Sequence, residues 1–166
     1  DELKKIIKIP TLEKLTKDKF SLDLILMIFP ELKNINVFFK LNIIKKNLLK
    51  EKDFIFLLSL MIIDGSDNAD YFLYKFNISK KDKKRIKFID NFYKEKINSK
   101  TFTENNINKI FYYHGKEITL DILNYRKIKS KKEDNALNQL IQHYEILEIP
   151  VMPVSAKFLM KKYKFH

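Results

Sequence analysis

Hydrophobic residues recur at intervals of three and four along most of the chain, which is the spacing that places them on one face of an α-helix. The clearest stretches run over 79–97, with Ile86 and Ile89 aligned, and over 133–148. Residues 53–64 are apolar on nearly every face, so we expect them to form the central core helix. The pattern predicts about eight or nine short helices and an all-α fold.

Prolines and one glycine indicate where several of these helices begin and end. Pro10 should stop a first helix at Ile9, because proline lacks the backbone N–H that a helix interior needs. Pro30 should instead open a helix, since a missing N–H costs nothing in the first turn. A helix that begins with the capping pattern at Thr101 should end at Gly115, where glycine adopts the left-handed conformation.

Two serines carry a shared pattern that predicts helix N-termini. Ser79 and Ser130 each precede two lysines and then an acid, as in a capping box. Lysines in a first helical turn oppose the helix dipole, whereas a bound phosphate would answer both them and the unpaired N–H groups. A polar break near Asn98 further predicts a helical body subdomain, 1–98, and a helical tail subdomain, 99–166.

Composition limits the class of protein. The chain has 166 residues, of which 45% are hydrophobic and 33% charged, as expected for an ordered globular domain. It has no cysteine, which excludes disulfides and thiolate metal sites. The most apolar run, 54–63, is shorter than the roughly 20 residues of a membrane-spanning helix, so we expect no membrane partner.

The charge balance suggests an acidic partner. Thirty-three Lys and Arg residues stand against 21 Asp and Glu residues, giving a net charge of +12, which is typical of proteins that bind polyanions. The same excess could be compositional, because Arg85 and Arg126 are the only arginines and the chain is rich in Ile and Asn. Scarce arginine disfavours base-specific reading and leaves contact with backbone phosphates.

The residues offer little for catalysis. His114, His143 and His166 have no second histidine or carboxylate pair at a metal-binding spacing, and the chain has no glycine-rich phosphate loop. We therefore predict no catalytic residue and no metal ligand in this segment. The aromatic side chains could stack on nucleic-acid bases, but we expect them to pack into the core; they are Tyr112, Tyr113 and Tyr163.

The end of the chain carries the most specific motif. Pro150 and Pro153 form an extended Pro-x-x-Pro segment, which a short Lys-containing helix follows. This segment resembles the C-terminal region of bacterial CCA-adding tRNA nucleotidyltransferases and poly(A) polymerases. The family usually has Gly and Asp after the second proline, where this chain has Ala156 and Phe158, while Leu159 fits the family pattern.

Three earlier phrases resemble the same family in the same order. They are Phe-Pro-Glu-Leu at 29–32, Phe-Asn-Ile-Ser at 76–79, and the phrase from 110 to 117 that Asp121 follows. The resemblance implies an all-α body and tail that hold tRNA by its shape and its phosphates. It also implies a cytoplasmic role in tRNA processing, with the 3′ end presented to a catalytic head that precedes Asp1 in the same chain.

That head would use Mg²⁺ with ATP or CTP, whereas this segment would need no cofactor. The basic side chains that we expect to contact tRNA phosphates are Arg126, Lys129, Lys131, Lys132, Lys157 and Lys161.

Two other classes of function remain open from the sequence. The chain could be a helical protein-interaction module whose basic charge is only compositional. It could also be a stand-alone helical hydrolase, which would be expected to bind a metal ion.

Overall fold

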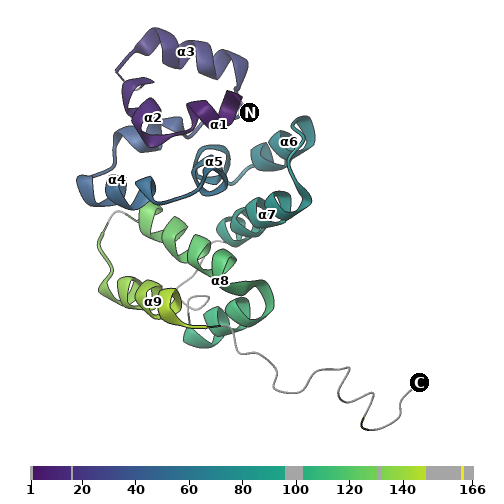
Figure 1. Ribbon diagram of the computed structural model, residues 1–166. Coiled ribbons are helices and arrows are strands. Elements are labelled where there is room, and N and C mark those ends of the chain that lie inside the picture. Colours follow the sequence, from purple (N-terminus) through teal and green to yellow (C-terminus); the bar gives the residue numbers. More distant parts are fainter. Residues whose placement is uncertain (1, 16, 96–102, 131, 149–161, 163–166) are drawn as a thin grey trace.

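The computed structural model describes residues 2–15, 17–95, 103–130, 132–148 and 162, and the regular secondary structure of these residues consists of helices alone, joined by turns and loops (Figure 1). This confirms the all-α prediction. The elements are α1 Glu2–Ile6, α2 Ile9–Leu15, α3 Lys19–Ile28, the 3₁₀-helix η1 Ile35–Phe39, α4 Ile43–Lys50, α5 Phe54–Ile62, α6 Asn68–Lys75, α7 Lys80–Lys94, α8 Glu104–Lys129 and α9 Asn135–Ile146.

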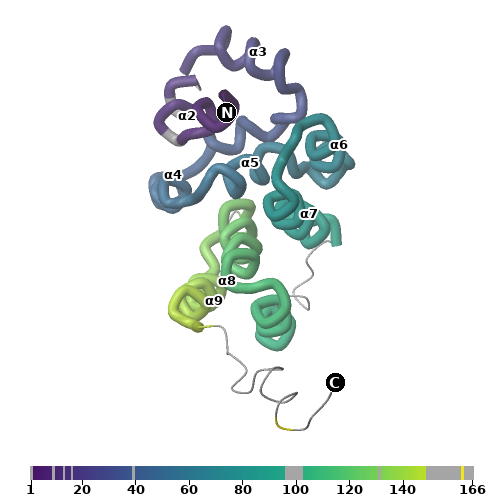
Figure 2. The backbone as a smooth tube through the Cα atoms, turned by 45° about the vertical axis from the view of Figure 1, so that its right-hand side comes forward, coloured from purple at the N-terminus to yellow at the C-terminus, as the bar shows by residue number. Residues whose placement is uncertain are grey.

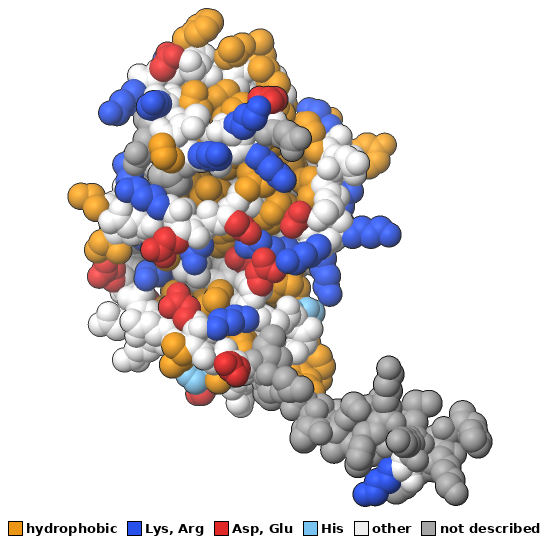
Figure 3. Space-filling view, in the orientation of Figure 1, with side chains coloured by type: hydrophobic (Ala, Val, Ile, Leu, Met, Phe, Trp, Pro, Cys, Tyr) orange, Lys and Arg blue, Asp and Glu red, His pale blue; other side chains and the backbone are white. Residues whose placement is uncertain are grey.

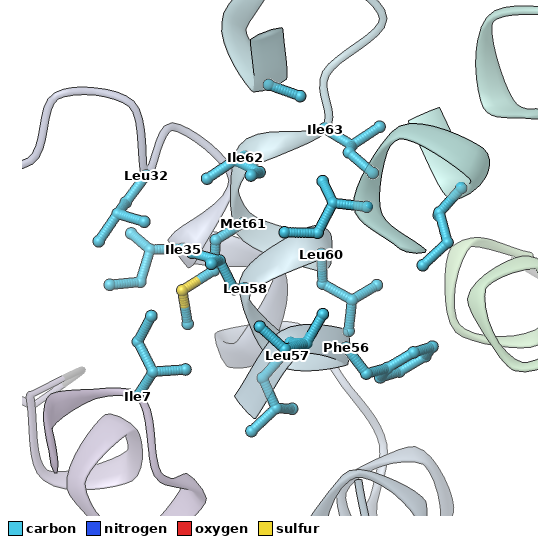
Figure 4. Close-up of a cluster of buried hydrophobic side chains, with 14 of the residues drawn as sticks. Ile7, Leu32, Ile35, Phe56, Leu57, Leu58, Leu60, Met61, Ile62 and Ile63 are labelled. Carbon is cyan, nitrogen blue, oxygen red and sulfur yellow. The ribbon is translucent and has the colours of Figure 1, made fainter. Parts of the chain in front are cut away.

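Helix α5 lies at the centre of the main hydrophobic cluster, as its uniform apolarity predicted. Every residue from Ile55 to Ile62 is buried, and the side chains point outward from the helix in all directions (Figure 4). Asp53 begins the helix by accepting a hydrogen bond from the Phe56 N–H at 2.9 Å. Helices α6 and α7 pack against one part of α5 and η1 against another, so α5 organises the N-terminal half.

A second cluster joins α8 to α9, with Ile107, Phe111 and Leu123 contributed by α8. It contains Phe111 and Tyr144, whose ring centroids lie 5.2 Å apart, and the Tyr144 hydroxyl donates to Asn108 Oδ1 at 2.7 Å. The later residues Tyr125 and Ile128 of α8 belong instead to the main cluster. Figure 2 shows α8 running from beside α4 and α7 to beside α9, so one helix contributes to both clusters.

Helix α8 is broken at Gly115, as the sequence predicted. Gly115 has φ 87° and ψ 173°, a combination that essentially only glycine adopts. The Thr119 hydroxyl donates to the Gly115 carbonyl at 2.9 Å, within the first turn that follows the break. The break changes the backbone conformation between the two halves of α8, and the half after it, through Leu123 and Tyr125, contributes to both the second and the main cluster.

Other predicted boundaries were wrong. Pro10 does not end a helix but is the second residue of α2, where its missing N–H is tolerated. Pro30 opens no helix, because Glu31 and Leu32 are buried in a turn before η1. That turn is fixed by Asn34, whose side-chain amide donates to the Ile63 carbonyl at 2.7 Å.

Two further expectations concern the extent of the fold. The predicted subdomain boundary near Asn98 lies outside the described residues, as do the capping residue Thr101 and the Pro-x-x-Pro segment. None of the described helices combines the length and apolar character that crossing a membrane requires.

Candidate nucleic-acid interface

A small cavity of about 90 Å³ lies where the start of α4, the end of α8 and the start of α9 meet. Three lysines and two acids line it, so positive charge exceeds negative charge there by one. Its lining consists of Asn42, Ile44, Lys45, Lys127, Ser130, Lys132, Glu133, Asp134, Leu137 and Asn138. We call this place the junction cavity.

Lys45 holds the junction cavity together. Its ammonium donates hydrogen bonds to the carbonyls of Ile128, at 3.1 Å, and Ser130. These carbonyls belong to the C-terminal end of α8, where backbone acceptors lack helical partners and the helix dipole favours a cation. Lys45, which belongs to α4, thus caps the C-terminal carbonyls of α8 and places a positive charge at the cavity.

The serine in this region has a different role from the one predicted. Ser130 does not cap the start of α9; it ends α8, and its N–H donates to the Arg126 carbonyl at 2.8 Å. The N-cap of α9 is Asp134, whose carboxylate accepts from the Leu137 N–H at 3.1 Å. Asp is at least as good an N-cap as Ser. Asp134 also lies closer in sequence than Ser130 to the apolar residues of α9, so α9 begins after Asp134.

The predicted tRNA contacts are only partly brought together. Lys132 is exposed and lines the junction cavity beside Lys127, while Arg126 is partly buried and does not line it. Lys129 also lies away from the cavity: its ammonium stands over the rings of Tyr93 and Tyr125, 5.8 and 5.5 Å from their centroids. Burial lowers the pKa of Lys129. The remaining predicted contacts, Lys131, Lys157 and Lys161, lie outside the described residues.

The other predicted basic helix start is present as expected. Ser79 caps α7, accepting from the Asp82 N–H at 3.1 Å and donating to the Asp82 carboxylate at 2.7 Å. Of the two lysines that follow, Lys81 forms an ion pair with Glu117 at 3.1 Å. Part of the positive charge at this helix start is therefore already neutralised within the chain.

A buried ion cluster centred on Arg85 of this same helix was not predicted. Arg85 is buried and forms two-pronged hydrogen bonds with Asp121 of α8 and with Asp53 at the start of α5. Its Nη1 also donates to Glu117 at 3.0 Å. Burial alone would lower the pKa of Arg85, but the bonds to Asp121 and Asp53 outweigh it and raise the pKa above its ordinary value. This Arg85 cluster fixes α5, α7 and α8 relative to one another.

The prediction for the central tyrosines was wrong. Tyr112 and Tyr113 do not pack into the core; they are 59% and 73% exposed and contact each other edge-to-face at 5.3 Å. The neighbouring core positions of α8 are taken by Ile107 and Phe111, which face α9. The buried face of this part of α8 therefore includes Phe111 but not the two tyrosines that follow it. Tyr163 lies outside the described residues.

The described histidines do not form a metal site. His114 lies against Phe88, with ring centroids 4.3 Å apart, and His143 lies against Tyr144 at the outer side of α9. Within the part of the chain that the structure describes, no group of three or more His, Asp or Glu side chains is placed to hold a metal ion.

Comparison with known proteins adds no relative. No protein-family model, no curated protein and no solved structure matches this chain.

Proposed function

We propose that this chain is the non-catalytic, tRNA-binding C-terminal part of a CCA-adding tRNA nucleotidyltransferase or a closely similar poly(A) polymerase. In this role its helices hold tRNA by shape and by phosphate contacts. They present the 3′ end to a catalytic head elsewhere in the parent protein, which would use Mg²⁺ and ATP or CTP. The proposal is supported by the sequence phrases shared with that family, by the all-α fold and by the excess of lysine.

The observation that carries the proposal is the grouping of three lysines at the junction cavity. Lys45 is fixed by the end of α8, while Lys127, within α8, and Lys132, after its end, line the same cavity. Lysine ammonium groups suit the phosphates of an RNA backbone and carry no sequence information. A surface of this kind fits recognition of RNA by position and charge.

Binding of transcribed tRNA at two salt concentrations tests the proposal. We expect affinity to fall steeply as salt rises, because phosphate contacts release bound counterions. Lys127→Gln with Lys132→Gln should lower the slope of log affinity against log salt by roughly one for each contact removed. The matched control is Lys84→Gln with Lys109→Gln, at exposed positions on α7 and α8. Absence of tRNA binding at low salt would exclude this function.

A second candidate function, a protein-interaction module, is favoured by the outer face of α3. Four apolar side chains there are exposed at helical spacing: Phe20, Leu24, Met27 and Ile28. Such a stripe is typical of a surface that another protein covers. Met27→Lys should then abolish binding of the partner protein without changing the affinity for tRNA. If the chain only binds RNA, this variant should match the wild type in assays of both protein binding and tRNA binding.

A further inference from the structure

The turn of α8 that precedes the break at Gly115 presents two aromatic rings to solvent. Tyr112 and Tyr113 are 59% and 73% exposed, while Phe111 beside them takes the buried position and packs against Tyr144. Figure 3 shows charged side chains of both signs gathered over the middle of the molecule, whereas hydrophobic side chains, a class that includes tyrosine, reach the surface at its lower end, over α8 and α9. We call Tyr112 and Tyr113 the tyrosine pair.

The two rings of the tyrosine pair stand almost perpendicular to each other. Successive residues of an α-helix point about 100° apart, so two neighbouring side chains fan out rather than stack on each other. The ring centroids are 5.3 Å apart and the interplanar angle is 85°. In an edge-to-face contact one ring gives its edge, so the contact covers a face of only one of the two rings. Most of both side chains therefore stays accessible to a flat ligand.

The surroundings of the tyrosine pair favour a base over an apolar partner. Residues 104–117 of α8 expose no aliphatic hydrophobic side chain, because Ile107 is buried and Ile110 is partly buried against the clusters behind it. A protein partner would find little apolar surface here besides the two rings, whereas an unpaired base needs only a ring face on which to stack. No acidic residue stands between Asn105 and Lys116 to repel a phosphate chain.

We propose that the tyrosine pair stacks on unpaired bases of single-stranded RNA, one base to a ring. Because the rings are perpendicular, two successive bases use them together only when the bases are splayed apart, as in loops and single-stranded ends. The parallel, paired bases of a duplex do not fit. The inference rests on the proposed function for the identity of the RNA, since the unpaired nucleotides would be those of the bound tRNA.

Removal of the rings tests the stacking. Tyr112→Leu with Tyr113→Leu keeps apolar side chains of good helix propensity, and circular dichroism checks that the fold is retained. The probes are a single-stranded oligouridine of about eight nucleotides and an abasic strand of equal length and charge. We expect the Leu variant to bind oligouridine at least about fivefold more weakly than the wild type and to bind the abasic strand unchanged. Tyr112→Phe with Tyr113→Phe keeps the rings and should stay within about twofold of the wild type.

Two further readouts separate stacking from charge. The chain contains no tryptophan, so Tyr113→Trp introduces a single indole, whose emission should be quenched by oligouridine and not by the abasic strand. The affinity lost in the Leu variant should also be the same at every salt concentration, because removing a ring changes no phosphate contact. Lys127→Gln with Lys132→Gln should instead change the salt slope.

Two tyrosines of α6 provide the matched control. Tyr71 and Tyr74 are 58% and 89% exposed, but α6 begins at Asp67 and Asp70, whose carboxylates repel an RNA backbone although Lys94 lies near both. Tyr71→Leu with Tyr74→Leu should therefore change the affinity for oligouridine by less than about twofold.

Three results would overturn the proposal. Oligouridine binding that does not depend on the tyrosine pair would leave these rings to another ligand, such as a partner protein. Equal affinity of the wild type for oligouridine and for the abasic strand would show that only the backbone is contacted. An equal loss in the Leu variants of α8 and α6 would mean that the site is not at the tyrosine pair.

Failure of the proposed function gives a different pattern. If tRNA does not bind at low salt while oligouridine binding depends on the tyrosine pair, the tRNA function is excluded and the stacking site stands. If tRNA binds the wild type and the Leu variant with equal affinity, the stacking site is excluded and the tRNA function stands.

Discussion

Arg85 is the side chain on which the packing of three helices depends. A buried guanidinium is costly unless its hydrogen bonds are satisfied, and here Asp121, Asp53 and Glu117 supply the acceptors from two other parts of the chain. The planar fork of arginine matches two carboxylates at once, which lysine could not do. In a chain whose basic residues are nearly all lysine, arginine has been used where this geometry is needed.

Asp53 gives this cluster a measurable pH dependence. Burial alone would raise the pKa of Asp53, but the bonds from Arg85 and from the Phe56 N–H outweigh it and hold the pKa below its ordinary value. The ionised form is thus favoured by folding, so its contribution is complete above the unfolded-state pKa of about 3.9 and is lost as pH falls through the lower folded pKa.

The variant Asp53→Asn isolates this charge, because Asn is an equally good N-cap for α5. At pH 7 we expect its free energy of unfolding to be lower than that of the wild type by about 1 kcal/mol, since Asp53 is half exposed. Urea unfolding between about pH 7 and pH 2.5 should show this difference shrinking as the solution is acidified. A difference that stays constant with pH would contradict the explanation. Asp23→Asn, on the exposed face of α3, is the control.

At the scale of elements, the break in α8 depends on a backbone conformation that side chains oppose. Gly115→Ala places a Cβ at φ 87°, and we expect a loss of about 1–3 kcal/mol in the free energy of unfolding. Urea denaturation measures the loss. Gln139→Ala, at an exposed position of α9, should change stability by less than about 0.5 kcal/mol. Equal stability of the Gly115 variant and the wild type would show that α8 can straighten without cost.

The contact between α4 and α8 makes a second prediction at this scale. Lys45→Met keeps the aliphatic stem of the side chain but removes both bonds to the carbonyls at the end of α8. We expect a loss of about 1.5–3 kcal/mol, the range for hydrogen bonds from a charged group. Thermal unfolding measures it, with Lys46→Met on the same helix as control. If both variants melt together, Lys45 does not stabilise the end of α8.

How far the sequence predicts these elements depends on the strength of each local pattern. Helix α5 was predictable because the sequence 54–63 is apolar at every position except Ser59, and α7 because Ser79 precedes a long stretch of apolar residues at helical spacing. Helix α4 was not predicted, and Lys45 was missed with it. Asn42 accepts from the Lys45 N–H at 2.9 Å as an N-cap, so that Asn before an apolar pair was the signal available.

The rest of the candidate site could not be predicted because it depends on tertiary contacts. Lys45 meets the carbonyls of Ile128 and Ser130, more than 80 residues further along the chain. Lys129 is drawn toward Tyr93 of a neighbouring helix, although its sequence neighbours suggest an exposed phosphate contact. Local spacing carries no information about either arrangement.

At the scale of the whole molecule, the charge of the chain acts on its own stability. Because 33 basic residues face 21 acidic ones, like-charge repulsion opposes the compact state. We expect the Tm to rise as sodium chloride is increased from about 0.02 to 0.3 M, since screening weakens this repulsion. Near pH 9.6, where the net charge approaches zero, the rise should vanish. A Tm that falls with salt at pH 7 would mean that ion pairs such as those of Arg85 outweigh the repulsion.

Because α8 contributes to each of the hydrophobic clusters, the two halves of the molecule should lose their structure together. The main cluster is incomplete without Tyr125 and Ile128, and the second cluster is incomplete without Phe111 of the same helix. Melting either cluster removes support from the other, so unfolding should be a single cooperative transition. Circular dichroism and tyrosine fluorescence should report the same denaturation midpoint, whereas two separated midpoints would mean that the break at Gly115 lets the clusters unfold one at a time.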